Sequence, residues 1–199
     1  MKKKIVFLTL AKENSNRLKN KNILSFSGKP LIYWTIKKIK KISDEHYINT
    51  DSEFILRYAK KLKIKTIIRS PKLKGDSIPS RHLMLDSFKH FPKETYAVIH
   101  VQANSPNLEI SKIKKVYDLL LHTDIEDIFS INSNGEINGS FWGITLNKLK
   151  TYNFNKKIHD HKSLKNECWI VDDSIDIHTI NEFRKTEREF KKNKKFIIS

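Results

Sequence analysis

The chain has 199 residues, 38% of them hydrophobic, which is enough for one compact domain with its own core. Its formal net charge is +17, from 39 Lys and Arg residues against 22 Asp and Glu residues. No stretch reaches the roughly 18 apolar residues that cross a bilayer, so the sequence excludes a membrane-spanning helix. The single cysteine, Cys168, excludes an internal disulfide framework and is typical of a reducing cytoplasm.

The positive charge has two interpretations. A basic protein attracts anions such as nucleic acids, membrane surfaces and phosphorylated substrates. The alternative is a lysine-rich surface without a role of its own. The lysines are spread along the chain, without an aromatic-interleaved RNA motif or a helix-turn-helix pattern. We therefore expect no nucleic-acid partner.

The first secondary-structure element is an apolar run over residues 5–10, preceded by three lysines. This start imitates a signal peptide, but the run is short and no small-residue cleavage site follows it. A near-continuous apolar run is typical of a central strand in a parallel sheet. We therefore interpret it as a buried first strand and expect a cytoplasmic protein.

Strand and helix patterns then alternate along the chain. Pro30 opens the first helix, whose solvent face is predicted to carry Lys37, Lys38, Lys40 and Lys41. The alternation predicts one α/β domain over residues 1–199, built on a wound, mostly parallel sheet. Further strands are expected over residues 46–51, 65–69, 96–102, 127–132, 140–145 and 167–171, and further helices over 53–62, 79–91 and 111–121, from Leu146 and from Thr179, with a hairpin turn over 132–139.

A polar loop follows the first strand and carries most of the chemistry. It contains Lys12, Ser15, Asn16, Arg17, Lys19 and Lys21. A basic loop between a strand and a helix presents cations and backbone N–H groups to phosphates. The loop matches neither a P-loop nor a dinucleotide-binding glycine pattern, so a plain basic surface loop stays open as the alternative.

Two histidine patterns are candidate sites. His100 lies inside the apolar strand 96–102, where a satisfied core residue is the favoured interpretation. His159 and His161 flank Asp160 and have the residue types of metal ligands. No third and fourth ligand stands at a recognised spacing, so a structural loop is favoured over a zinc site.

Several short motifs, in order along the chain, together resemble the acylneuraminate cytidylyltransferase family, which includes the CMP-sialic acid synthetases and their relatives for other nonulosonic acids. The motifs are Leu10-Ala11-Lys12, Ser15-Asn16-Arg17, Lys21-Asn22, Gly28-Lys29-Pro30-Leu31, Asn49-Thr50-Asp51, Arg69-Ser70-Pro71 with Gly75-Asp76, Val101 to Pro106, and Asp173 to Ile177. The resemblance implies a three-layer Rossmann-like nucleotide-diphospho-sugar transferase fold. It also implies CTP-dependent transfer of CMP to a sugar acid such as an N-acylneuraminate, with release of pyrophosphate, in cell-surface polysaccharide biosynthesis.

The same resemblance assigns roles to particular residues. The nucleotide would be held by Leu10, Ala11, Lys12, Ser15, Lys21, Asn22, Arg69 and Asp76. Lys12, Asn16, Arg17 and Lys21 would be the catalytic residues, and Gln102 and Asn104 would bind the acceptor. Asp176 and His178 would hold Mg²⁺, a hard cation that prefers oxygen ligands.

The chain departs from the family pattern at four places. Lys12 stands where the family has Arg, Asn16 where it has Lys, and His178 where it has a second metal-binding Asp. The turn over residues 132–139 replaces the long insertion that forms the family's dimerisation arm. These departures keep open a catalytically impaired nucleotide-binding subunit, or a cytidylyltransferase for a smaller phosphonate or phosphate acceptor. Any homodimer is expected to differ from the arm-exchanged one.

Overall fold

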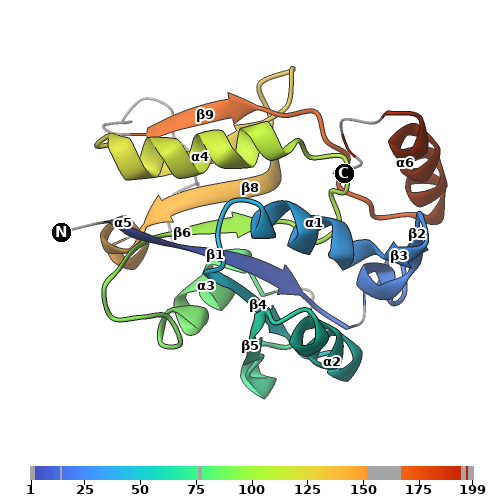
Figure 1. Ribbon diagram of the computed structural model, residues 1–199, viewed down its shortest axis with the longest axis horizontal. Helices are drawn as coiled ribbons and strands as arrows, with labels where there is room; N and C mark the ends of the chain where they lie inside the picture. Colours follow the sequence, from blue (N-terminus) through green and yellow to red (C-terminus); the bar gives the residue numbers. More distant parts are fainter. Residues whose placement is uncertain (1–2, 14, 76–77, 152–166, 194–195, 197–199) are drawn as a thin grey trace.

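The computed structural model describes residues 3–13, 15–75, 78–151, 167–193 and 196. A central sheet runs through these residues, with helices on both of its faces (Figure 1). The strands of this sheet are β1 (Lys4–Ala11), β4 (His46–Thr50), β5 (Lys65–Ile68), β6 (Thr95–Val101), β7 (Asp127–Ile131), β8 (Ile137–Thr145) and β9 (Glu167–Val171). The strand order is β5-β4-β1-β6-β8-β7-β9.

Within the central sheet, the described strands pair in parallel except where β8 lies antiparallel between β6 and β7. The described helices are α1 (Leu31–Lys40), α2 (Glu53–Lys61), α3 (Ser80–Phe88), α4 (Ile110–His122), α5 (Leu146–Thr151) and α6 (Ile180–Lys192), with short 3-10 turns at Lys21–Ile23 and Pro71–Leu73. The short strands β2 (Ser25–Phe26) and β3 (Lys29–Pro30) form a separate antiparallel pair. The predicted α/β class and mostly parallel sheet are therefore confirmed.

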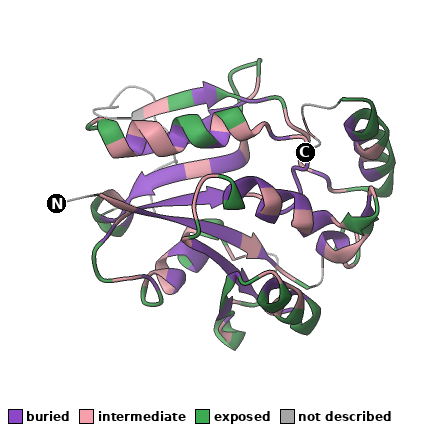
Figure 2. Ribbon diagram, viewed as in Figure 1, coloured by how far each residue is buried: buried purple, intermediate pink, exposed green. Residues whose placement is uncertain are grey.

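The first strand lies inside the sheet, as the sequence predicts. β1 pairs with β4 on one side and β6 on the other, and its residues 5–9 are fully buried (Figure 2). Its side chains alternate between the two faces. Phe7 packs toward α4, whereas Val6 and Leu8 pack toward α3 and α5. Burial on both faces explains why the strand reads as a continuous apolar run.

The last helix packs against the start of α1 and the β2–β3 pair. α6 begins with a capping box, in which the Thr179 hydroxyl accepts from the Glu182 backbone N–H and the Glu182 carboxylate accepts from the Thr179 N–H. Phe183 and Phe190 of α6 meet the ring of Phe26 edge-on, with ring centres 5.3 and 5.2 Å apart. This aromatic cluster ties the end of the chain to the segment that precedes α1.

A hairpin joins β7 and β8 as expected, but its turn is shorter than the predicted 132–139, because β8 begins at Ile137. The backbone N–H of Asn132 donates to the Glu136 carbonyl at 2.7 Å, and Gly135 has a φ of +81°, which favours glycine. Two hydrogen bonds join the Ser133 backbone and hydroxyl to the Asp173 carboxylate. The turn thus folds back onto its own chain.

The solvent face predicted for α1 is wrong at one position. Lys38 is 2% exposed, and its ammonium donates to the Pro106 carbonyl. The apolar spacing of α1 shows which side meets the sheet, but α1 is also covered along its flank by the loop after β6. The helix predicted over residues 79–91 is shorter and runs from Ser80 to Phe88. Its start differs because Pro79 is the N-cap residue and precedes the first turn. Within the described residues, no helix has the length and apolar character to cross a membrane.

Candidate functional site

A pocket of about 460 Å³ opens at the carboxyl ends of β1 and β6. The chain leaves β1 toward β4 and β5 on one side and later returns to β6 on the other. Open α/β sheets bind ligands outside the strand ends at such a reversal of strand order. Leu10, near the end of β1, and Gln102, just after β6, line the pocket on its floor.

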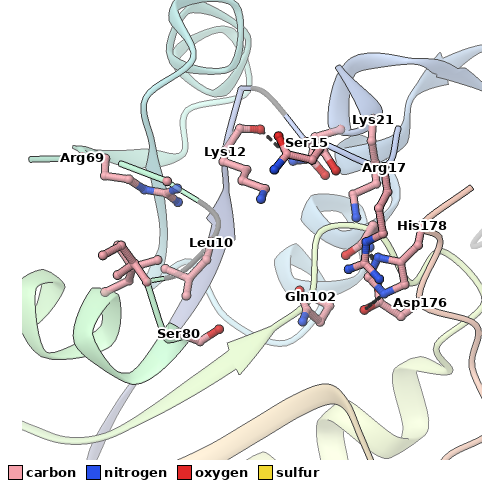
Figure 3. Close-up of a pocket in the computed structure, with 16 residues that line it drawn as sticks. Leu10, Lys12, Ser15, Arg17, Lys21, Arg69, Ser80, Gln102, Asp176 and His178 are labelled. Atoms are coloured by element: carbon pink, nitrogen blue, oxygen red, sulfur yellow. Dashed lines mark hydrogen bonds and ion pairs between the residues drawn. The ribbon is translucent and has the colours of Figure 1, made fainter. Parts of the chain in front are cut away.

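The loop after β1 supplies one wall of the pocket. The Asn22 side chain donates to the Lys12 carbonyl at 3.1 Å, and the Glu13 N–H donates to the Asp51 carboxylate at 2.9 Å. These two bonds join the loop to its own far end and to the start of α2. Lys12 therefore extends into the middle of the pocket (Figure 3).

Arg69 forms the opposite wall and is itself held rigidly. Its guanidinium donates to the Asn49 side-chain oxygen at 3.0 Å and to the Asn49 carbonyl at 3.1 Å. The Asn49 amide in turn donates to Ser87 of α3 at 2.9 Å. Arg69 is 3% exposed, and burial lowers its pKa. This network joins the motifs around residues 49 and 69, which are far apart in the sequence, at one wall of the pocket.

The loop after β6 and the segment after β9 meet on the other side. The Asn104 side chain donates to the Asp176 carboxylate and, at 2.9 Å, to the Ile177 carbonyl. The Ile177 N–H donates back to the Asn104 carbonyl at 3.1 Å, and Lys21 donates to the Ile177 carbonyl at 2.9 Å. The loop after β1, the loop after β6 and the segment after β9 thus meet at Ile177.

Asp176 and His178 contact each other inside the pocket. The Nε2 atom of His178 lies 2.9 Å from the Oδ2 atom of Asp176 (Figure 3). Burial raises the pKa of Asp176, against the attraction of His178 and Lys21. Burial likewise lowers the pKa of His178, against the attraction of Asp176. Burial therefore favours the neutral forms of both side chains over the charged ion pair.

The pocket is strongly electropositive. Among the residues that the structure describes, its lining holds four cationic side chains, those of Lys12, Arg17, Lys21 and Arg69, and one carboxylate, that of Asp176. Burial lowers the pKa of Lys12, and the positive charges of Arg69 and Arg17 lower it further. Burial also lowers the pKa of Lys21. Cations crowded in this way gain stability when a polyanion neutralises them.

Most of the predicted site residues meet at this pocket. Its lining includes Leu10, Lys12, Ser15, Asn16, Arg17, Lys21, Asn22, Arg69, Gln102, Asn104, Asp176 and His178. Ala11 is fully buried in the core with Ile32 and Ile48 instead. Asp76, His159, Asp160 and His161 lie outside the described residues. Among the residues that the structure describes, no group of three or more His, Cys, Asp or Glu side chains gathers as metal ligands do.

The contribution of α3 to the pocket was not predicted from the sequence. Ile78, Ser80 and Leu83 line it beside Gly75. The sequence feature that indicates this contribution is the loop that ends at Pro79, because it brings the start of α3 to the same edge of the sheet. His100 is buried as expected, but its Nε2 atom has no hydrogen-bond partner among the described residues, and burial lowers its pKa to about 4.

A second cavity of about 240 Å³ adjoins the pocket, and Ser80 and Gln102 line both. The walls of this cavity are mostly apolar and include Phe129, Phe141 and Trp142. The two cavities together provide a charged chamber beside an aromatic one.

A cationic pocket at the strand reversal of a mostly parallel sheet is the arrangement of a Rossmann-like nucleotidyltransferase domain. A solved structure with this fold is CMP:2-keto-3-deoxy-manno-octonic acid synthetase complexed with CTP, which superposes with a TM-score of 0.74. The match covers 95% of this chain and 99% of that one at 12% identity, which shows the shared fold. The chain itself belongs to the cytidylyltransferase family, whose model matches residues 6–192.

Two curated relatives are similar over the greater part of the chain. N-acylneuraminate cytidylyltransferase of Oncorhynchus mykiss is 30% identical over 135 residues, covering 65% of this chain and 30% of that protein. Pseudaminic acid cytidylyltransferase of Campylobacter jejuni is 27% identical over 126 residues, covering 60% of this chain and 54% of that protein. The matched part therefore spans under a third of the first relative and about half of the second.

Proposed function

We propose that the protein is a CTP-dependent cytidylyltransferase that joins CMP to an anionic sugar acid of the nonulosonic type and releases pyrophosphate. The observation that supports this most directly is the convergence of Lys12, Arg17, Lys21 and Arg69 on one pocket at the strand reversal. A triphosphate carries several negative charges and is bound through cations and N–H donors. Membership of the cytidylyltransferase family supports CTP as the nucleotide.

The reaction would join two ligands in the two adjoining cavities. A hydroxyl oxygen of the acceptor attacks the α-phosphorus of CTP and gives up its proton to solvent, and the bond from that phosphorus to the bridging oxygen of pyrophosphate breaks. Positioning and charge neutralisation are the main contributions of a protein to such a transfer. We assign neutralisation of the phosphates to Lys12, Arg17 and Lys21, with Ser15 as a further donor.

The base and the acceptor would lie on either side of the phosphates. The family resemblance assigns Leu10 and Asn22 to the cytosine and ribose, and Arg69 lies on the same side of the pocket as Leu10 (Figure 3). Gln102 lines both cavities, so an acceptor in the second cavity reaches the α-phosphate across it. The aromatic walls favour an acceptor that carries apolar substituents over a bare phosphate or phosphonate.

Mg²⁺ is the cofactor that this proposal implies. The donor set fits an ion held mainly by the phosphates, because Asp176 offers one carboxylate and Mg²⁺ in such sites keeps one or two carboxylate ligands. His178 fits less well, since its Nε2 atom is engaged with Asp176 and Mg²⁺ prefers oxygen. When bound, the ion would neutralise charge that develops on the phosphates. Asp176 would orient it, and Asn104 would hold Asp176 in place.

The test is pyrophosphate release by the purified protein with each of the four nucleoside triphosphates and a panel of acceptors. The panel contains N-acetylneuraminate, a diacylated nonulosonic acid, a 2-keto-3-deoxy sugar acid and a small phosphonate. We expect release with CTP and a nonulosonic acid, and formation of the matching CMP product. Release with another nucleotide but not with CTP would contradict the proposal. CTP binding without product, across the whole panel, would assign the protein to the catalytically impaired alternative.

A further inference from the structure

Lys38 of α1 is a buried lysine outside the two cavities. It is 2% exposed, and the Pro106 carbonyl is its one hydrogen-bond acceptor among the described residues. An ammonium has three donors, so a buried ammonium with one neutral acceptor opposes folding. Burial lowers the pKa of Lys38 to about 7, with the Asp172 carboxylate acting in the opposite direction. A group that opposes folding in this way points to a role other than stability.

Lys38 acts together with Thr35, one helical turn earlier on the same side of α1. The Thr35 hydroxyl donates to the Gln102 carbonyl at 2.9 Å, and Lys38 donates to the Pro106 carbonyl. The helix therefore holds both ends of the loop over residues 102–106. The side chains of Gln102 and Asn104, within this loop, line the pocket.

The loop in turn positions the carboxylate of the pocket. Asn104 donates to Asp176 and to the Ile177 carbonyl, and it accepts from the Ile177 N–H. A shift of the Pro106 end of the loop therefore moves Asn104, and Asn104 carries Asp176 with it. The connection runs from Lys38 to the Pro106 carbonyl by a hydrogen bond, along the backbone through Ser105 to Asn104, and by a hydrogen bond from Asn104 to Asp176.

We propose that Lys38 is a positioning residue for the pocket: its ammonium fixes the Pro106 end of the loop, and through Asn104 the loop fixes the Asp176 carboxylate. The link to a reaction rests on the proposed cytidylyl transfer, whereas the link from Lys38 to Asn104 stands on the contacts alone. Lys38 touches neither CTP nor the acceptor in this proposal.

The proposal has a consequence in the neutral pH range. Because the pKa of Lys38 is lowered to about 7, the side chain loses its charge where an exposed lysine keeps it. A charge-assisted hydrogen bond is about twice as strong as a neutral one, so the hold on Pro106 weakens as the pH rises. Among the described residues, Asp172 is the ionisable group that acts on Lys38, and Asp172 also pairs with Lys112 of α4 at 2.9 Å.

The variant Lys38→Met removes the ammonium and keeps an unbranched chain. We expect a higher melting temperature at pH 6, because the buried charge is gone. We also expect kcat to fall about tenfold, the order of one charge-assisted hydrogen bond, with the KM for CTP changed less than threefold. The matched control is Lys40→Met, since Lys40 is an exposed lysine of the same helix that donates to the Leu62 carbonyl at 3.1 Å, away from the loop.

A second readout needs no activity, and its first part needs no variant. The side-chain amide of Asn104, followed by nitrogen–proton NMR in the wild type, is expected to shift with a midpoint near pH 7. The shift is expected to disappear in Lys38→Met and to remain in Lys40→Met. This readout keeps the proposal testable if the wild type transfers no cytidylyl group, and an Asn104 amide that does not respond to pH in the wild type would overturn the proposal even if Lys38→Met does not fold.

Each result decides the question. A higher melting temperature with a lower kcat, and loss of the Asn104 shift, supports positioning. Parallel loss of melting temperature and kcat would assign Lys38 to folding and overturn the proposal. An Asn104 amide that does not respond to pH in the wild type would overturn it as well. Absence of transfer by the wild type, with the Asn104 shift present, would reject the proposed function and leave Lys38 as the positioning residue of a nucleotide-binding pocket.

Discussion

The ammonium of Lys21 donates to the backbone carbonyl of Ile177 at 2.9 Å, across 156 positions of sequence. The first loop of the chain is thereby bonded to the segment that carries Asp176 and His178. Lys21 is 8% exposed and also lines the pocket. Lys21 therefore joins two segments through one hydrogen bond, and its remaining N–H donors can bind a phosphate in the pocket.

Replacing Lys21 with Ala is expected to weaken CTP binding about tenfold or more, because one charge-assisted contact contributes about 1.5–3 kcal/mol. The melting temperature is expected to fall as well, since the bond to Ile177 is lost. Calorimetric titration with CTP and thermal unfolding measure the two effects. Lys19→Ala is the control, because Lys19 is an exposed lysine of the same loop outside the pocket. A CTP affinity in Lys21→Ala equal to that of Lys19→Ala would contradict the assignment.

Binding of CTP is expected to take up protons at alkaline pH. The pKa values of Lys12 and Lys21 are lowered by burial, and a bound triphosphate raises them again. By linkage, CTP affinity then falls as the pH rises through the pKa values of the free protein. Titrations at pH 9 in two buffers of different ionisation enthalpy measure the uptake. Lys12→Arg should reduce it, because arginine stays protonated. Identical apparent enthalpies in the two buffers would rule this out.

The Mg²⁺ assignment makes a prediction about Asp176 and His178. Asp176→Ala is expected to abolish cytidylyl transfer, whereas Asp173→Ala is not, because Asp173 is exposed and bonded to Ser133 outside the pocket. His178→Asp combined with Asn16→Lys is expected to raise the rate and lower the Mg²⁺ concentration needed, since an oxygen ligand replaces an imidazole. Product formation against Mg²⁺ concentration measures both. Robust transfer by Asp176→Ala would remove Asp176 from the metal site.

Stability is expected to decline on acidification below pH 6.5. The pKa of His100 is about 4 in the folded protein and about 6.5 when unfolded, so the unfolded state binds more protons between these values. The native state then loses roughly 3 kcal/mol from His100 as the pH falls through this window, at about 1.36 kcal/mol per pKa unit. Denaturant unfolding from pH 7 to pH 4 should show a shallower slope in His100→Leu than in His90→Leu, in which an exposed histidine is replaced. Equal slopes would contradict the burial argument.

Any dimer is expected to leave the β7–β8 hairpin outside the partner's pocket. Ser133 bonds to Asp173, and Asn138 donates to the Asp172 carbonyl, so the hairpin is tied to its own chain. Light scattering gives the oligomeric state, and crosslinking from Asn134→Cys gives the neighbours of the hairpin. A crosslink from that position to the partner's loop at residues 12–21 would show that the hairpin reaches across.

Local patterns were sufficient for the elements and for most of the site. The continuous apolar run at the start predicted an interior strand, because burial on both faces leaves no polar position. The order of strands and helices placed the loops after β1 and β6 at one edge of a parallel sheet. Lys12, Lys21, Gln102 and Asn104 therefore gather there as expected. The contribution of Ser80 was missed because a helix start lining a pocket has the same sequence signature as any other helix start.

The sequence by itself determined the wound α/β domain, its interior first strand and the basic character of the loop that faces the pocket, because periodicity and charge are local properties. The tertiary structure alone decided which polar groups pair. It buried Lys38 against Pro106 where helical spacing predicted exposure, and it bonded Lys21 to Ile177. Such contacts join segments far apart in the chain, and only the packing of the loops over the sheet edge brings them within hydrogen-bonding distance.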